Sequence, residues 1–429
     1  MRADPSPKDT AALFAGAVGV GLAAGLLAVA FEAALGLAGQ ARAFVGGGAG
    51  DPGRRLALSI GFSALAAGTG VWLVRRFAPE TSGSGIPQVE AALHQHRDLA
   101  WKRTVVVKYF GGLLAIGGGL TLGREGPTVQ LGAAAGRALG GPPRPGEERS
   151  RTLVAAGAGA GLAAAFNAPI AGTVFVLEEL KVLRSARHAL AALVAAATAD
   201  GVCRLLLSAR PSFGVVTVDR PPLWTLAVFL LVGAAAGALA ALFNWSLLAS
   251  LALFDRMRSG HGIARGVSLA VAVGAVVGLT GAFAPEWLGS GEPLVDRALH
   301  APPAAAAAAV ILLVRFALTL LSYSSGAAGG LFAPLLVLGC HAGLLLSLGA
   351  ARVVPALGLD PVAVAIVAMG ALFAGSVRAP LTGVLLMVEM TGAFTLLLPL
   401  LFASAAAHVA ARLLGAKPIY EALENHRGV

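Results

Sequence analysis

The stretch GREGPTVQLG, residues 123–132, interrupts an apolar run with a glycine, an arginine, a glutamate and a proline. Its counterpart in the second half is GLFAP at 330–334, because Pro127 returns as Pro334 (334 − 127 = 207). GSGIP at 83–87 returns as GSGEP at 289–293 with nearly the same offset. In a chain this apolar, matched Gly and Pro interruptions indicate a duplicated membrane transporter whose site lies between the halves.

A third repeated motif separates two neighbouring acids. The four matched residues are Ala168, Pro169, Gly172 and Glu178, which recur at Ala379, Pro380, Gly383 and Glu389, each 211 positions later. Glu178 therefore belongs to a pattern that both halves share, whereas Glu179 does not. This difference favours a structural role for Glu178, which both halves share, and a role for Glu179 that is specific to the first half.

Composition places the chain in a membrane. Of its 429 residues 57% are hydrophobic, and the mean hydropathy is +0.80. Only 13% are charged, against about 25% in ordinary globular proteins. Each long apolar segment is close to the roughly 20 residues that cross a bilayer. We expect such segments near 11–38, 56–78, 104–122, 187–209, 223–254, 264–285, 305–322 and 394–415.

Shorter apolar segments lie between the long ones, and several are flanked by Gly and Pro. They cover about 84–97, 124–139, 168–180, 330–348, 361–375 and 379–390. Backbone that stops at membrane depth must be covered by protein or line a wet cavity. Half-helices that end near the membrane midplane fit this pattern. The sequence therefore predicts an all-α membrane protein.

The charge pattern excludes nucleic acid as a partner. The net charge is +10, yet the basic residues are scattered or lie in short interruptions such as Lys181, Arg184 and Arg187. No basic stripe is interleaved with exposed aromatics. Positive loops that face the cytoplasm explain the charge better. Cys203 and Cys340 lack metal-ligand spacing, so we expect neither a metal nor a cofactor.

The organisation follows from the repeats. We expect a cytoplasmic tail over 1–10, a first membrane repeat over 11–210, a second over 211–416 and a C-terminal segment over 417–429. The first ten residues are too polar for a cleavable signal, and the apolar run after them is too long for one. The chain should therefore keep its first span in a multi-pass protein of the cell membrane.

The repeated turns can bind an anion. Small residues let the backbone turn tightly, and a proline near a helix start loses no hydrogen bond. A helix N-terminus carries roughly half a positive charge and unpaired donors, so several that converge make an anion site without a full cation. Such a site balances binding against release. Ser84 would add a hydroxyl, or it would simply cap its own helix.

Glu125 is the residue that points most directly to a mechanism. A carboxylate between apolar segments costs several kcal/mol unless it is paired, so intramembrane acids are functional candidates. At a helix start the ionised side chain can occupy an anion site, and the protonated side chain can leave it. The alternative is a carboxylate that caps its own helix or pairs with Arg124. Lys108, in an apolar span, can set the local potential, snorkel or form an ion pair.

Two other function classes lack support in the sequence. An intramembrane enzyme needs a nucleophile with a base or a metal cluster, and the chain has no GxSxG or HExxH motif. Cation-coupled transport of an organic solute would need a carboxyl-rich site, which is hard to find. We therefore expect a transport protein that is not an enzyme.

Taken together, the motifs resemble those of the CLC chloride channels and transporters. The resemblance rests on five motifs in this order, GSGIP at 83–87, GREGPTVQLG at 123–132, GLAAAFNAP at 161–169, GGLFAP at 329–334 and KPIY at 417–420. It spans most of the chain. It implies a CLC-type fold of two inverted repeats with many tilted and broken helices, and a homodimer with a separate anion pathway in each subunit.

The resemblance also assigns roles to single residues. The central anion site would use the hydroxyls of Ser84 and Tyr420 with the backbone amides of Leu331 and Phe332. The other anion sites would use the amides near Gly83 and Ser84 on the inner side, and those around Arg124, Glu125 and Gly126 on the outer side. Serine at position 84 favours chloride over the other anions of the family.

Two glutamates would carry the protons. Glu125 matches the gating glutamate of the family, which transporters also use as proton carrier. Glu179 matches the internal proton-transfer glutamate that exchangers usually carry, although an interfacial acid beside Lys181 and Arg184 is the alternative. The predicted function is therefore exchange of chloride for protons across the membrane. A passive chloride channel of the same fold, gated by voltage or pH, stays open as the alternative.

Overall fold

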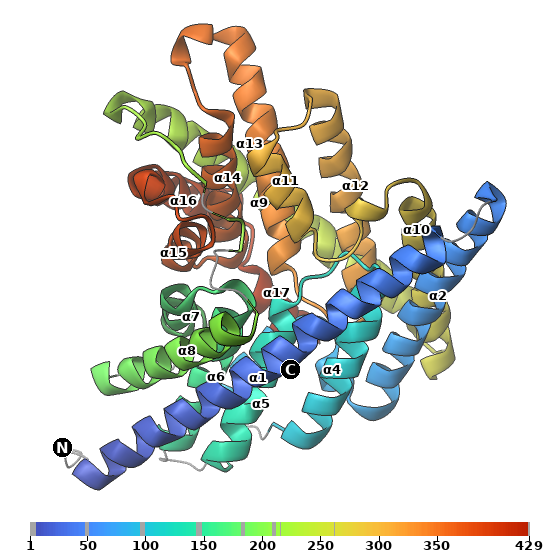
Figure 1. Ribbon diagram of the computed structural model, residues 1–429, viewed down its shortest axis with the longest axis vertical. Helices are drawn as coiled ribbons and strands as arrows, with labels where there is room; N and C mark the ends of the chain where they lie inside the picture. The colour runs from blue at the N-terminus through green and yellow to red at the C-terminus, as the bar shows by residue number, and fades with distance from the viewer. Residues whose placement is uncertain are drawn as a thin grey trace.

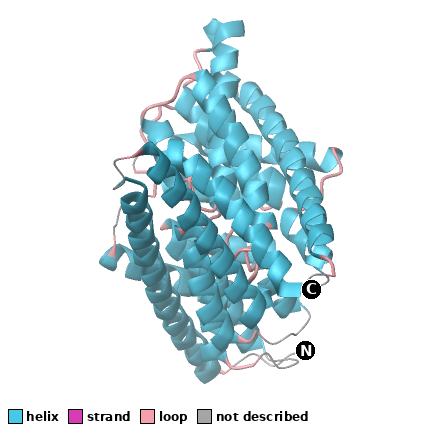
Figure 2. Cartoon of the chain, turned by 90° about the vertical axis from the view of Figure 1, so that its right-hand side faces the viewer, coloured by secondary structure: helices cyan, strands magenta, loops and turns pink. Residues whose placement is uncertain are grey.

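The structure is a computed structural model that describes residues 6–47, 51–94, 99–142, 148–181, 185–207, 212–214, 216–260 and 262–427. Some predictions fall wholly or partly outside these residues. They are the tail over 1–10, the apolar segments near 84–97 and 187–209, the repeat boundary at 210–211, the C-terminal segment over 417–429 and the contribution of Arg184. Within the described residues all regular structure is helical, apart from two isolated β-bridges, which agrees with the predicted all-α class (Figure 2).

The first half of the chain forms eight α-helices and two short helical turns. These are α1 (Pro7–Gly47), α2 (Pro52–Phe77), η1 (Pro79–Thr81), α3 (Ile86–His94), α4 (Trp101–Gly117), α5 (Glu125–Gly140), α6 (Glu148–Phe166), α7 (Pro169–Phe175), η2 (Val176–Leu180) and α8 (Ala186–Leu206). The second half forms nine α-helices and four 3₁₀ turns. These are η3 (Leu223–Thr225), α9 (Leu226–Arg258), α10 (Gly262–Phe283), η4 (Pro285–Trp287), α11 (Glu292–His300), α12 (Ala305–Ser324), α13 (Phe332–Val353), η5 (Pro355–Leu357), α14 (Pro361–Val377), α15 (Pro380–Thr391), η6 (Phe394–Leu396), α16 (Leu397–Leu413) and α17 (Ile419–Arg427).

Helix starts coincide with prolines and capping residues, as the turn chemistry predicts. Asp51 precedes Pro52, and its carboxylate accepts a hydrogen bond from the Arg54 amide at 2.8 Å. Asp360 caps α14 in the same way, through the Val362 amide at 2.8 Å. The half-helices α7 and α15 each begin on the repeated Ala-Pro pair.

The sequence-based boundaries need several corrections. By length and composition eight described helices can cross a membrane, namely α1, α2, α8, the η3–α9 unit, α10, α12, α13 and the η6–α16 unit. The run at 104–122 was expected among them, but α4 ends at Gly117, the first of three consecutive glycines. The segment at 330–348 was expected to be short, yet α13 continues to Val353. The apolar pattern did not predict α6 or α11 as separate helices.

The two halves pack in equivalent ways. α1 contacts α6 and α8 as α9 contacts α14 and α16, and α5 lies on α6 as α13 lies on α14. In Figure 1 the pair α7 and α8 lies beside the pair α15 and α16. Glu178, in η2 directly after α7, contacts Leu381 at the start of α15, and Glu389 near the end of α15 contacts Ile170 at the start of α7. The pairs therefore run antiparallel, which is the geometry of an inverted repeat.

Small residues allow the helices to approach closely. A Cβ atom at Gly132 of α5 would collide with the backbone of Gly157 in α6, and one at Gly157 would collide with Gly132. In the same way Gly274 of α10 faces the Ser63 carbonyl of α2, where an added Cβ would lie 2.5 Å from the oxygen. The glycine and alanine run of α6 is therefore a packing surface for α5.

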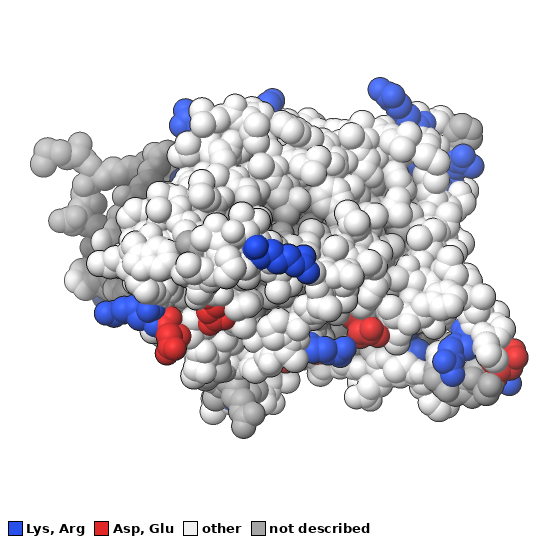
Figure 3. Space-filling model, turned by 90° about the horizontal axis from the view of Figure 1, so that it is seen from above, with Lys and Arg blue, Asp and Glu red and all other residues white. Residues whose placement is uncertain are grey.

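The outer surface matches a membrane environment. Figure 3 shows a face on which the charged side chains gather mainly along the edges, with one basic side chain alone on a broad uncharged area. Large apolar side chains such as Leu65, Leu231 and Leu313 are about 70% exposed on long helices. In water such exposure would be unfavourable, but lipid is the natural solvent for it.

Candidate functional site

Two β-bridges join the three interrupted motifs. Gly83 of GSGIP pairs with Ala328, since its amide donates to the Ala327 carbonyl at 2.9 Å and its carbonyl accepts from the Gly329 amide at 2.9 Å. Gly123 of GREGP pairs with Gly330 through two bonds of 2.8 and 2.7 Å. Segments 245 residues apart (328 − 83) and 207 residues apart (330 − 123) therefore meet, and they bring together the starts of α3, α5 and α13.

The first of these bridges corrects one prediction. Backbone amides near Gly83 and Ser84 were expected to form the inner anion site. In the structure the Gly83 N–H is bonded to the Ala327 carbonyl, so this amide is not available to an anion. The glycine is needed for its conformation instead, because Gly83 has a φ of 67° and Gly85 a φ of 85°, which side chains rarely adopt.

Ser84 lies in the turn between these glycines and is fully buried. Its hydroxyl accepts a hydrogen bond from the Ile86 amide at 3.3 Å, which is the capping role that the sequence left open. The hydroxyl keeps its own proton for a further acceptor. The Ser84 amide donates to the hydroxyl of Tyr323 at 3.4 Å. Tyr323 was not predicted from the sequence, because a tyrosine in an apolar helix gives no motif.

Glu125 is the first residue of α5, and its carboxylate reaches the start of α13. The Ala333 amide donates to its Oε1 at 2.7 Å. The side chain is fully buried, and its Oε2 has no hydrogen-bond partner among the described residues. The carboxylate thus occupies a helix N-terminus of the other repeat, where the first N–H groups lack partners within the helix.

Arg124 does not pair with Glu125. Its guanidinium lies 2.7 Å from Glu32 and 3.2 Å from Glu292, and it also donates to the Ala165 carbonyl at 3.0 Å. Two carboxylates from distant segments therefore bind this cation. Neither Glu32 nor Glu292 was predicted as a neighbour, although Glu292 is the residue at which the second GSG turn departs from the first.

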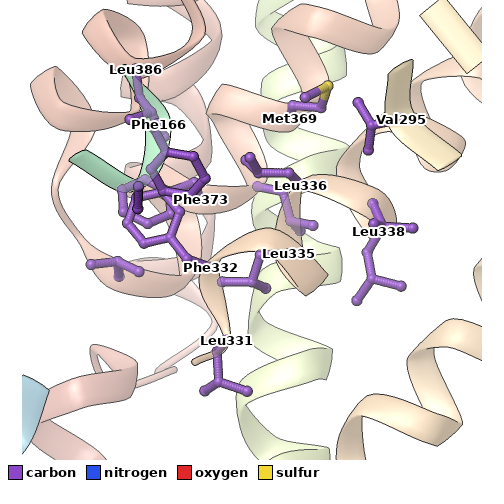
Figure 4. Packing of buried hydrophobic residues seen from close by; sticks show 14 of the residues in the cluster. Phe166, Val295, Leu331, Phe332, Leu335, Leu336, Leu338, Met369, Phe373 and Leu386 are labelled. Atoms are coloured by element: carbon purple, nitrogen blue, oxygen red, sulfur yellow. The ribbon is translucent and has the colours of Figure 1, made fainter. Parts of the chain in front are cut away.

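Leu331 is the N-cap residue of α13 and Phe332 is the first residue of the helix, so both lie where backbone amides lack partners within the helix. The amide that holds the Glu125 carboxylate is one residue further along, at Ala333. The centroid of the Phe332 ring lies 4.1 Å from that of Phe373 and 5.2 Å from that of Phe166. The Leu331 side chain points away from these rings (Figure 4). This aromatic contact fixes the first turn of α13 from the side.

Gly126 is the point of closest approach between the motifs. A Cβ atom there would lie 2.8 Å from the Ser84 carbonyl oxygen and 2.9 Å from the Gly330 Cα. Any other residue would push the turns apart. The glycine therefore allows the start of α5 to lie against both the Ser84 turn and the start of α13.

Tyr420 lies in the first turn of α17, which contacts α3. Its side chain is fully buried, and its hydroxyl has no hydrogen-bond partner among the described residues. The hydroxyl interacts electrostatically with Glu125, Glu179 and Tyr323. An unpartnered buried hydroxyl is rare and needs an explanation. A phenol can donate one hydrogen bond, and an anion beside Ser84 and Glu125 would accept it.

Glu179 lies in the π-helical turn η2, which ends at Lys181 in a left-handed conformation with φ 52°. The side chain is buried, and the charged groups that act on it include Glu90 of α3 and Lys181. Glu90 was not predicted from the sequence. Wide helical turns of this kind are frequent at functional sites.

Two buried cations occupy equivalent places in the repeats. The Lys108 ammonium donates to the carbonyls of Thr81 at 2.9 Å and Gly83 at 2.6 Å. Arg315 lies 207 positions later and donates to the carbonyls of Trp287 and Gly289, both at 2.8 Å. Each cation therefore holds the backbone of its own GSG turn. This role was not among those predicted for Lys108, which were setting the local potential, snorkelling and forming an ion pair.

Comparison with known proteins places the chain in a family. Residues 62–412 match the family described as voltage gated chloride channel. The H(+)/Cl(−) exchange transporter ClcA of Vibrio cholerae is 40% identical over 413 residues, which cover 94% of this chain and 87% of that protein. ClcA of Salmonella schwarzengrund is 39% identical, with 99% and 89% covered.

A solved structure agrees with this assignment. The structure of a slow cyanobacterial Cl−/H+ antiporter is 33% identical to the chain and superposes with a TM-score of 0.91, with 97% of this chain and 98% of that chain covered. The resemblance drawn from the sequence motifs is thereby confirmed. The chain belongs to the voltage gated chloride channel family.

Proposed function

We propose that this protein exchanges chloride for protons across the membrane. One observation carries the proposal: the Glu125 carboxylate accepts a hydrogen bond from the Ala333 amide at the start of α13, 2.7 Å away. A carboxylate in that place occupies a position built for an anion. Relatives that are named as chloride and proton exchangers support the same conclusion.

Exchange follows from competition for one position. The ionised side chain of Glu125 occupies the start of α13. Once it takes up a proton, its attraction to the helix dipole falls and it can leave. Chloride then binds to the amides at the start of α13 and to the hydroxyls of Ser84 and Tyr420. Chloride binding therefore promotes proton uptake, and proton uptake promotes chloride binding to the same degree.

The proton needs a second acid on the other side of the anion site. Glu179 is buried in η2, and both Glu179 and Glu125 act electrostatically on the buried Tyr420 hydroxyl. We assign to Glu179 the transfer of protons between the inner solution and Glu125. Glu178, its neighbour, is bound to the start of α15 and takes no part in this route.

The proposed assembly is a homodimer in the cell membrane, with one anion pathway in each subunit. The turns of GSGIP, GREGP and GGLFAP meet within a single subunit, which supports a separate pathway in each. Chloride, protons and the lipid bilayer are the only partners that this function needs. Crosslinking in membranes, followed by electrophoresis, would measure the number of subunits.

The test is a flux assay with simultaneous pH recording. Purified protein is reconstituted into vesicles with equal chloride on both sides and a pH gradient. An exchanger sets a zero-current voltage that follows the pH gradient, and an imposed chloride gradient drives protons uphill. A zero-current voltage that ignores pH would instead select a passive chloride channel of the same fold.

A further inference from the structure

A cavity of about 380 Å³ lies where the membrane-spanning helices α1, α2 and α10 end near η4. Its wall includes Gly39 and Arg42 of α1, Arg55 and Ser59 of α2, Phe283 of α10 and Leu288. None of these residues belongs to the anion site, so the mechanism proposed above does not use this cavity.

The cavity brings two arginines together without an acid. Neither Arg42 nor Arg55 forms an ion pair within the described part of the chain. The Arg42 side chain donates from Nη1 to the Gly117 carbonyl at 3.2 Å, which leaves other N–H groups of its guanidinium for a ligand. Two carboxylates lie close by in sequence, but Asp51 caps α2 through the Arg54 amide and exposed Glu286 is not part of the wall.

The cavity lies at the outer surface of the membrane. α2 and α10 pack antiparallel, since Gly68 faces Val271 and Gly278 faces Ser59. The opposite ends of α2, α9 and α10 carry five arginines, which are Arg75, Arg76, Arg256, Arg258 and Arg265. Basic residues gather on the cytoplasmic side of membrane proteins, so the end with the cavity faces outward.

The wall combines charge with apolar surface at headgroup depth. Arg42 lies four residues before the end of the first spanning segment, Arg55 lies three residues after the start of the second, and Phe283 ends the fifth. Phe283 of the wall is 80% exposed. A ligand that satisfies both parts carries a phosphate for the guanidinium groups and a hydrocarbon chain for Phe283.

We propose that this cavity binds the phosphate group of an anionic phospholipid from the outer leaflet. The two guanidinium groups hold the phosphate oxygens, and the acyl chains follow the apolar surface beside Phe283. The site also touches the core of the protein. Leu288 of the wall packs against Gly281 and Gly119. The Gly119 carbonyl in turn accepts a hydrogen bond from the Gly289 amide at 3.0 Å. Lipid binding should therefore stabilise the junction of α1, α2 and α10.

The experiment uses the full-length protein in an uncharged detergent. Phosphatidylglycerol is titrated in, and native mass spectrometry counts the lipid molecules that each protein retains. Sodium phosphate at matched concentrations forms the second arm. We expect the wild-type protein to retain phosphatidylglycerol and to unfold at a higher temperature with it, whereas sodium phosphate should have neither effect.

Three variants make the assignment specific. Arg42→Gln combined with Arg55→Gln should weaken retention at least tenfold. Gly39→Leu keeps both charges but fills the cavity, and it should weaken retention to a similar degree; an added side chain meets nothing within 4 Å there, so the fold should tolerate it. Arg54→Gln removes a neighbouring arginine outside the wall and should bind lipid as the wild type does.

Several outcomes would overturn the proposal. Unchanged retention in the double variant and in Gly39→Leu would show that the lipid binds elsewhere. Equal weakening by Arg54→Gln would show a general effect of surface charge. Stabilisation by sodium phosphate alone would show that the cavity takes free phosphate and not a lipid.

Discussion

Glu178 and Glu389 cap each other's half of the molecule. The carboxylate of Glu178 accepts bonds from the Leu381 and Thr382 amides at 3.0 and 2.7 Å. The carboxylate of Glu389 accepts bonds from the Ile170 and Ala171 amides at 3.1 and 2.7 Å. Each acid therefore binds the N-terminus of the half-helix that carries the other, which links the two repeats around a pseudo-twofold axis.

Loss of either cap should destabilise the protein. We expect Glu178→Ala to lower the free energy of unfolding by about 2 kcal/mol, because it leaves two amides of a helix start without acceptors. Glu389→Ala should have a similar effect. Thermal unfolding in detergent at one fixed scan rate measures both, with Glu286→Ala as an exposed control.

The double variant Glu178→Ala, Glu389→Ala tests whether the two caps act as one unit. Residues in contact usually show coupling of about 0.5–3 kcal/mol, and here each acid holds the helix that positions the other. We therefore expect the double variant to lose clearly less or clearly more stability than the two single variants together. Strict additivity would show that the two contacts are independent.

Tyr420 and Tyr323 provide a matched pair of substitutions at the anion site. The hydroxyl of Tyr420 has no partner among the described residues, so Tyr420→Phe should leave stability unchanged within about 0.5 kcal/mol. Chloride should bind several-fold more weakly, since the anion loses one donor. Tyr323→Phe should instead reduce stability, because its hydroxyl accepts the Ser84 amide. Calorimetric titration with chloride and thermal unfolding separate the two effects.

Much of the fold could be predicted because the residues that recur between the two halves are mainly Gly and Pro. These residues fix turns and helix starts locally, so GSGIP, GREGP and GGLFAP could be identified without a structure, and the structure joins them. Because Glu178 and Glu389 hold equivalent positions in the two halves, the structural role of Glu178 could also be predicted. The inversion of the halves could not be predicted from the offsets, because an offset carries no direction in space.

The parts that were missed depend on tertiary contacts. Helix α6 looks like a low-complexity run of Ala and Gly, and its helical length depends on packing against α5. The Gly83 amide was assigned to an anion, yet its actual partner, Ala327, lies in the other repeat. Tyr323, Glu32 and Glu90 carry no local motif, so only the folded chain shows that they surround the site.

Substitution of the Glu125 carboxylate tests the coupling. Glu125→Gln keeps the shape of the side chain but cannot exchange a proton. We expect chloride flux to persist and proton flux to disappear, and the zero-current voltage should then ignore the pH gradient. Glu286→Gln, an exposed acid outside the site, should behave as the wild type. Coupled proton movement in the Glu125→Gln protein would reject the proposed carrier.

Substitution of Glu179 tests the inner part of the proton route. Glu179→Val should abolish proton transport while chloride still crosses, because the anion site itself is left intact. Glu421→Gln removes a neighbouring exposed acid and should leave both fluxes coupled. If Glu179→Val still moved protons against their gradient, protons would have to enter by a different route.

The two buried cations should differ in their effect on transport although their structural contacts match. Lys108→Met releases the carbonyls of Thr81 and Gly83 and loosens the turn that holds Ser84, so chloride affinity should fall about tenfold, equal to about 1.4 kcal/mol. Arg315→Met releases the equivalent turn at 289–291 in the second half. This turn leads into Glu292, which is paired with Arg124, and it contributes no residue to the proposed anion site. Both variants should unfold at a lower temperature, but Arg315→Met should bind chloride almost as the wild type does. An equal loss of chloride affinity in the two variants would mean that the cations act through their charge and not through the turns they hold.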